Sequence, residues 1–79
     1  MYYVYVLHST KDGKRYIGFT EDLRRRISEH NAGLVNSTKY RHPLELVYSE
    51  QFSDKKSAMD REKFFKTHPG RDFLDSIGK

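Results

Sequence analysis

The sequence predicts a small domain of the mixed α/β (α+β) class. Two stretches rich in Tyr and Val, residues 2–8 and 15–20, have strand character, and residues 44–50 alternate well enough to form a third strand. Residues 20–32 and 53–68 instead carry apolar side chains at helical spacing. A chain of 79 residues has room for one core, so we expect a single domain over residues 1–79.

Composition excludes several classes of function. Because the chain has no cysteine, it can contain neither a disulfide, nor a thiolate metal site, nor a thiol nucleophile. It has no apolar run of membrane-spanning length and no basic-then-apolar leader, which predicts a soluble, cytoplasmic protein. The formal net charge of +4 mildly favours polyanions such as nucleic acid, although many small domains are this basic for solubility.

The first two strands are expected to form a hairpin. Asp12-Gly13 is a strong signal for a two-residue turn, which would place Ser9 opposite Tyr16. Since side chains alternate between faces, one face then carries Tyr3, Tyr5, Leu7, Ser9, Tyr16 and Gly18. Gly18 has no side chain and would leave room there for another backbone or a ligand.

The first helix is expected to begin after Thr20, a plausible N-cap, and to end near residues 32–33. Glu21 and Asp22 would lie in its first turn, where the helix dipole favours acids.

At 100° per residue, Leu23 and Ile27 form the core-facing stripe of this helix. Arg26 and His30 lie beside that stripe, one turn apart, while Arg24 and Arg25 project into solvent. Arginine suits phosphate and histidine titrates near neutrality, but a basic pair on a helix is often only a solvated flank.

Residues 34–43 read as a loop that contains the basic and aromatic tripeptide Lys39-Tyr40-Arg41. Such a stretch suits a nucleic-acid surface, and a solvated loop equally well. Ser53 is a candidate N-cap for a second helix, which is expected to run to about His68 and to be closed by Pro69-Gly70. Residues 71–77 could add one or two helical turns.

Glu62 is the most informative residue of the second helix, because it shares an apolar stripe with Ala58 and Phe65. An ionised carboxylate facing a core is costly unless it is paired, hydrogen-bonded or bound to a cation. The alternatives are an ion pair with a residue such as Arg26, a position at the edge of the core, or a metal site.

Tyrosines on strands are usually core residues, but two phenols opposite a helix that presents Arg and His are more specific. A tyrosine whose pKa, normally about 10, is lowered by nearby cations could act as a general base for water. His8, His42 and His68 lack ligand spacing, which argues against a zinc site.

Together these residues resemble the GIY-YIG nuclease family in order and spacing. Tyr3-Val4-Tyr5 stands where the family has Gly-Ile-Tyr, with Tyr3 and Val4 as departures, and Tyr16-Ile17-Gly18 matches the second tripeptide outright. Arg26 and His30 match positions on the family's first helix, and Glu62 matches its metal-binding glutamate. The tail from Lys66 to Leu74 looks like that of small bacterial members.

The resemblance implies a central three-stranded antiparallel sheet flanked by helices. It also implies hydrolysis of a DNA phosphodiester with one divalent cation, Mg²⁺ or Mn²⁺, held by Glu62. Arg26 would offset phosphoryl charge, Tyr5 or Tyr16 would orient or deprotonate water, and His30 would relay the proton. Gly18, Lys39 and Arg41 are further candidates for contacting the nucleic acid.

Two other functions remain open from the sequence. A catalytically silent or partner-dependent nucleic-acid-binding module is one, since a core this small has little surface for recognition and could depend on a protein partner for specificity. A small interaction domain unrelated to nucleic acid is the other. Steeply salt-dependent DNA binding separates the two. The sequence does not fix the oligomeric state or the pathway, for which repair, recombination and processing are candidates.

Overall fold

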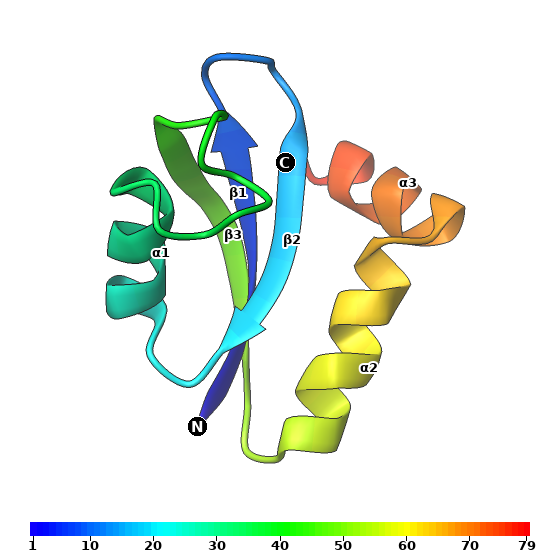
Figure 1. Ribbon diagram of the computed structural model, residues 1–79. Helices are drawn as coiled ribbons and strands as arrows, with labels where there is room; N and C mark the ends of the chain where they lie inside the picture. The colour runs from blue at the N-terminus through cyan, green and yellow to red at the C-terminus, as the bar shows by residue number, and fades with distance from the viewer.

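A computed structural model describes residues 1–79 and shows a three-stranded antiparallel sheet with three helices (Figure 1). The elements are β1 (Tyr2–Ser9), β2 (Arg15–Thr20), α1 (Leu23–Asn31), β3 (Leu44–Phe52), α2 (Lys55–Phe65) and α3 (His68–Ser76). Strand β1 lies between β2 and β3, so that β2 and β3 are both edge strands. Helix α1 covers one face of the sheet, and α2 and α3 cover the other (Figure 1). The predicted mixed fold is confirmed.

Strand β1 has apolar side chains on both of its faces, so it contributes to a buried cluster on each side of the sheet. On the α2 and α3 face, the buried cluster consists of Val4, Val6, Ala58, Phe65 and Leu74. On the α1 face, it consists of Tyr5, Leu7 and Leu44, with Tyr16, Leu23 and Ile27 packed against them. The core stripe predicted for the first helix, Leu23 and Ile27, is therefore confirmed, and the central strand contributes to both clusters.

The hairpin register differs from the prediction by two residues. Leu7, rather than Ser9, lies opposite Tyr16. The cause is a longer loop, in which Ser9 Oγ accepts the backbone N–H groups of Lys11 and Asp12, both at 3.2 Å, and keeps them out of the ladder. Because a shift of two residues preserves the alternation of side chains, Tyr5, Leu7 and Tyr16 still share one face, as predicted.

The first helix begins two residues later than expected. Asp22 is the N-cap of α1 in place of Thr20, and its carboxylate accepts the N–H of Arg25 at 3.1 Å. The predicted end is confirmed, because Ala32 is the C-cap and Gly33 follows with a φ of 77°, which glycine adopts without strain.

The second helix is shorter than predicted, and the C-terminal helix is longer. Asp54, not Ser53, caps α2, which ends at Phe65 rather than near His68. Pro69-Gly70 does not close α2 but lies in the first turn of α3, which Thr67 caps. A Cβ atom on Gly70 would overlap the carbonyl of Phe64, so the glycine lets the two helices meet closely. None of the three helices is long and apolar enough to cross a membrane.

A partly buried ion pair fixes α2 on the sheet and thereby positions the residues of its accessible face. Arg61 Nε and Nη2 donate to the Glu50 carboxylate on β3 at 2.8 and 3.1 Å. The same guanidinium lies 4.6 Å from the ring centroid of Phe65. Burial opposes ionisation of Glu50, but hydrogen bonds from Arg61 and Tyr48 outweigh it and lower the pKa of Glu50.

Candidate active site

Tyr5 forms the floor of the candidate site. It lies on the central strand β1 and is only 1% exposed. Gly18 lies directly opposite on β2, and a Cβ atom there would overlap the Tyr5 hydroxyl. The space that the sequence suggested for a ligand or another backbone at Gly18 is therefore filled by the Tyr5 ring. Gly18 positions Tyr5 and does not itself offer an open surface.

His30 of α1 lies against both tyrosines of this face. The side chain is fully buried, and its Nε2 lies 2.9 Å from the Tyr5 hydroxyl. Its Nδ1 lies 2.7 Å from the Thr38 hydroxyl, so both ring nitrogens are hydrogen-bonded. The edge of the ring also packs against Tyr16, with 4.9 Å between centroids. The two tyrosines predicted to share a face thus converge on one buried histidine.

Burial determines the protonation of Tyr5 and His30. Desolvation raises the pKa of Tyr5 above its ordinary value, although the neighbouring Arg26 guanidinium opposes this shift. Desolvation also lowers the pKa of His30, and the charge of Arg26 acts in the same direction. Both groups are therefore neutral near pH 7. The expectation that nearby cations lower the pKa of a site tyrosine is wrong for Tyr5.

Tyr16 and Arg26 are the more accessible polar groups of this face. Tyr16, on the edge strand β2, is half-buried, and Ser37 donates a hydrogen bond to its hydroxyl at 3.3 Å. The Arg26 side chain is 37% exposed and donates to Glu29 at 3.1 Å. An ion pair this exposed contributes little stability, so Arg26 can exchange Glu29 for an anionic ligand at low cost.

Glu62 lies on α2, at the edge of the core. Its side chain is 20% exposed, and Lys66 Nζ donates to its Oε2 at 3.2 Å. The alternative of an ion pair with Arg26 is wrong, since the carboxylate partner of Arg26 is Glu29. The Glu62 charge nevertheless contributes to the raised pKa of Tyr5, so the α2 carboxylate acts electrostatically on the floor of the site.

The donor set at Glu62 suits a cation shared with a substrate. One carboxylate oxygen is engaged by Lys66, and no side chain or backbone group of the protein hydrogen-bonds the other. Mg²⁺ is commonly held by one or two carboxylates, with water and substrate phosphates completing its shell. No group of three or more His, Cys, Asp or Glu side chains is placed to enclose a metal ion. Glu62 therefore fits an open, single-carboxylate site and not a closed one.

The basic loop residues suggested for nucleic-acid contact have partners within the chain. Arg41 Nε pairs with Asp12 at 2.8 Å, and Arg41 Nη2 donates to the carbonyl of Arg15. Hydrogen bonding to Arg41 lowers the pKa of Asp12 to about 2. Arg41 thus ties the loop before β3 to the first hairpin. Lys39 lies 5.1 Å from the centroid of the exposed Tyr40 ring, and these two remain accessible.

Thr38 and Ser37 support the site but were not identified from the sequence. Both belong to a short polar run that resembles an ordinary turn, and nothing in its spacing indicates that one hydroxyl is fully buried against His30. Asn31 was missed in the same way. Its side-chain amide bonds both the N–H and the carbonyl of Leu44, which anchors the end of α1 to the start of β3.

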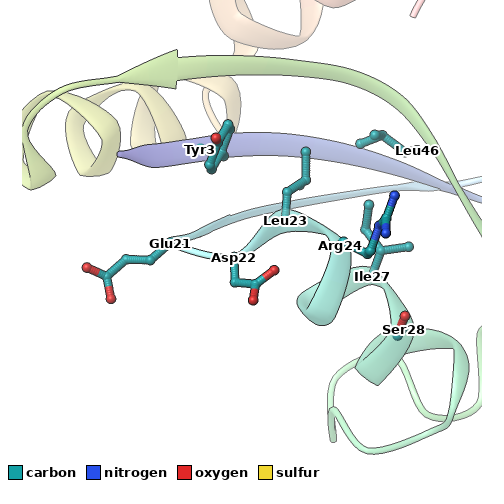
Figure 2. Close-up of a pocket in the computed structure, with 8 residues that line it drawn as sticks. All are labelled: Tyr3, Glu21, Asp22, Leu23, Arg24, Ile27, Ser28 and Leu46. Carbon is teal, nitrogen blue, oxygen red and sulfur yellow. The ribbon is translucent and has the colours of Figure 1, made fainter.

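The most voluminous groove of the molecule, about 640 Å³, lies elsewhere on the α1 side. Figure 2 shows Leu23 and Ile27 of α1 directed toward the sheet, where Tyr3 and Leu46 complete an apolar wall. The carboxylate of Glu21 points outward beside it (Figure 2). None of Tyr5, Tyr16, Arg26, His30 and Glu62 lines this groove, so it is separate from the candidate site.

Several known proteins are similar to this chain in sequence. The chain is 45% identical to the UPF0213 protein spr1390 of Streptococcus pneumoniae over 81% of its length, and 46% identical to YazA of Bacillus subtilis over 71%. It spans only 65% and 58% of these two relatives. A UPF0213 protein of Staphylococcus haemolyticus is 46% identical, with 96% of this chain and 93% of the relative covered.

A solved structure and a family model extend the comparison. The solution NMR structure of the UPF0213 protein BH0048 from Bacillus halodurans has 37% sequence identity and a TM-score of 0.59, and the match covers 98% of this chain and 85% of that one. The model of the GIY-YIG catalytic domain matches residues 1–72, which include both tripeptides, α1 and α2. The chain therefore belongs to the GIY-YIG family.

Proposed function

We propose that the protein is a metal-dependent DNA endonuclease that hydrolyses phosphodiester bonds. The observation that carries the proposal is the convergence of Tyr5 and Tyr16 on His30, with Arg26 close enough to Tyr5 to affect its pKa. Arg26, whose guanidinium matches phosphate oxygens, lies near the buried Tyr5, while Tyr16 is the phenol of this face that water can reach. Membership of a nuclease domain family supports nucleic acid as the substrate class.

In the proposed mechanism, the two tyrosines have different roles. Tyr16 is half-buried, and its hydroxyl accepts a hydrogen bond from the attacking water and orients it toward the phosphorus. Tyr5 is almost fully buried and hydrogen-bonded to His30, which makes both of them positioning residues. A buried, neutral His30 fixes the Tyr5 hydroxyl, and we do not assign it the proton relay that the family resemblance suggested.

Arg26 supplies positive charge where the reaction develops negative charge. As the oxygen of water bonds to phosphorus and the bond to the leaving sugar oxygen breaks, charge accumulates on the nonbridging oxygens. Arg26 stabilises them by donating hydrogen bonds in place of its weak contact with Glu29. The leaving oxygen takes up a proton, so that one water is consumed for each bond cut. A divalent cation held by Glu62 would act as a Lewis acid on the phosphoryl group.

The proposal is tested by cleavage of plasmid and branched DNA in Mg²⁺, in Mn²⁺ and with chelator. Glu62→Gln and Arg26→Ala should each lower the cleavage rate by roughly 10²-fold or more, as is typical when one transition-state contact is lost. Lys63→Ala, an exposed change one residue from Glu62 on α2, is the matched control and should cut like the wild type. Cutting that survives both site variants would overturn the proposal.

A catalytically silent DNA-binding module is the second candidate, favoured by the small surface available for recognition. In that case wild type and Glu62→Gln would both retain DNA at low salt, and neither would cut any substrate in any metal. A role in repair, recombination or processing, and a protein partner that supplies specificity, remain part of the proposal only, because the chain spans 65% or less of two of its relatives.

A further inference from the structure

A basic pocket lies beside the candidate site, at the other side of the edge strand β2. It has a volume of about 460 Å³ and lies between the start of β2 and the junction of α2 with α3. Four of its lining residues are cationic, namely Lys14, Arg15, Lys66 and Arg71, and no carboxylate lines it. Lys14 comes from the hairpin loop and Arg71 from α3, so the fold brings together charges that are far apart in the sequence.

Two of these four cations have no anionic partner. Arg15 pairs with Asp75, and Lys66 pairs with Glu62. Neither Lys14 nor Arg71 makes an ion pair, and neither the Lys14 ammonium nor the Arg71 guanidinium makes a hydrogen bond within the chain, although the Lys14 backbone N–H donates to Asp12. Both are exposed. The pocket therefore carries uncompensated positive charge that an anionic ligand can neutralise.

The pocket is continuous with the residues of the proposed reaction. Tyr16 lines it, together with Ile17 and Phe65. Lys66 links it to the carboxylate of Glu62 on the same helix. An anion bound in the pocket therefore lies next to Tyr16, the residue whose phenol we assign to the attacking water. The half-buried Ile17 gives the pocket a small apolar side against which a sugar can pack.

We propose that this pocket binds a backbone phosphate of the DNA strand being cut, next to the phosphate that is hydrolysed. The inference rests on the proposed function and adds a path for the strand, along the edge of β2 from Tyr16 toward Lys14 and Arg71. Such contacts position the substrate and make affinity strongly salt-dependent, while carrying no sequence information.

The experiment measures binding of a fluorescent duplex with a single-stranded flap, in chelator so that no cutting occurs. The double variant Lys14→Ala/Arg71→Ala should weaken binding roughly tenfold at low salt and reduce the slope of log affinity against log salt by about two. The matched control, Lys55→Ala/Lys63→Ala on α2, removes the same charge from residues that also lack ion pairs and lie outside the pocket. It should bind nearly like the wild type.

Equal losses of DNA affinity in the two double variants would overturn the proposed phosphate site, because affinity would then depend only on net charge. Substrates with 5′-hydroxyl and 5′-phosphate ends separate the two sources of phosphate. A loss seen only with phosphorylated ends would overturn the assignment to the backbone in favour of a terminal phosphate. If the wild type neither binds nor cuts DNA, the proposed function itself fails. If the wild type binds and cuts DNA while the Lys14→Ala/Arg71→Ala variant binds it like the control variant, only the proposed phosphate site is wrong.

Discussion

Gly18 is conspicuous at the scale of single residues, because its missing side chain is what admits the Tyr5 ring. A Gly18→Ala substitution puts a methyl group where the Tyr5 hydroxyl lies, so the ring must move. We expect a loss of about 1–3 kcal/mol in the free energy of unfolding, typical of overpacking. Because the added Cβ would overlap the ring as well as the hydroxyl of Tyr5, urea unfolding of the single and double variants with Tyr5→Leu, which lacks the ring, provides the check. The cost should be smaller in the Leu background, and equal costs would show that the Tyr5 ring does not produce it.

His30 should make stability depend on pH. Its pKa is lowered in the folded state, so between that value and the unfolded value of about 6.5 the unfolded chain binds more protons. The free energy of unfolding therefore falls as pH decreases through about 6.5, and the loss stops growing once the pH is below the folded pKa. Urea unfolding from about pH 8 to pH 5 measures this slope.

The comparison for this slope is His30→Gln, which keeps a polar side chain between Tyr5 and Thr38 but does not titrate. The variant should be less stable overall, because its amide cannot reproduce both hydrogen bonds of the ring. Its stability should nevertheless change less over the same pH range. An unchanged slope would mean that another group produces the pH dependence.

For helices and strands, the sequence predicted which segments form each element better than it predicted the register of the hairpin or the boundary between α2 and α3. All three strands and the first helix lie within two residues of where alternation and helical spacing predicted them, because burial of one face sets the spacing of the apolar side chains. The predicted register of the hairpin was wrong because Ser9 Oγ accepts hydrogen bonds from two loop N–H groups. The spacing of apolar residues carries no information about such bonds. The end of α2 was predicted too late because Thr67 caps a new helix, and Pro69-Gly70, which was expected to close α2, lies in the first turn of that helix.

The candidate site shows the same limit. Motif and face were enough to propose Tyr5, Tyr16, Arg26, His30 and Glu62 from the sequence, whereas the burial of each side chain was not predictable. A single sequence does not indicate that Tyr5 and His30 are closed off from solvent while Tyr16 and Arg26 are accessible. That difference depends on the loop before β3, whose buried Thr38 hydroxyl lies 2.7 Å from His30 Nδ1. It is also what separates the roles of the two tyrosines.

At the C-cap of α2, Lys66 connects the two proposed ligand sites. Its ammonium engages one oxygen of Glu62, where it competes with a divalent cation for the same carboxylate. Lys66→Ala should therefore raise the affinity of the free protein for Mn²⁺, by roughly two- to fivefold for a pair this exposed. Direct Mn²⁺ titration by electron paramagnetic resonance measures the effect without DNA.

The control for this titration is again Lys63→Ala, which removes a charge from the same helix but not from Glu62. The same Lys66 variant should bind DNA more weakly, since Lys66 also lines the basic pocket. Opposite effects on metal and on DNA would distinguish this arrangement from a general change in charge. Unchanged Mn²⁺ affinity in Lys66→Ala would contradict the competition.

For the molecule as a whole, the stability of each face of the sheet depends on the other, because both faces share the central strand β1. One cluster of five buried residues lies under α2 and α3, and one of three lies under α1, with β1 shared between them. Neither cluster is large enough to be stable without the strand that separates them. We therefore expect the domain to unfold in one step, so that a packing defect on the α3 face reaches the candidate site on the α1 face.

The variants Leu74→Val and Leu7→Val test this coupling from opposite faces, since both side chains are fully buried. Removing one methylene should lower the free energy of unfolding by about 1 kcal/mol in each case. NMR-detected urea unfolding can follow the amides of Ala58 and His30 separately. In both variants the two amides should lose their native signals at the same lowered midpoint, because a sheet three strands wide cannot remain folded with only one face covered. A Leu74→Val midpoint that falls at Ala58 but not at His30 would mean that the site is stable independently of α2 and α3, and Glu62 would then belong to a separately mobile layer.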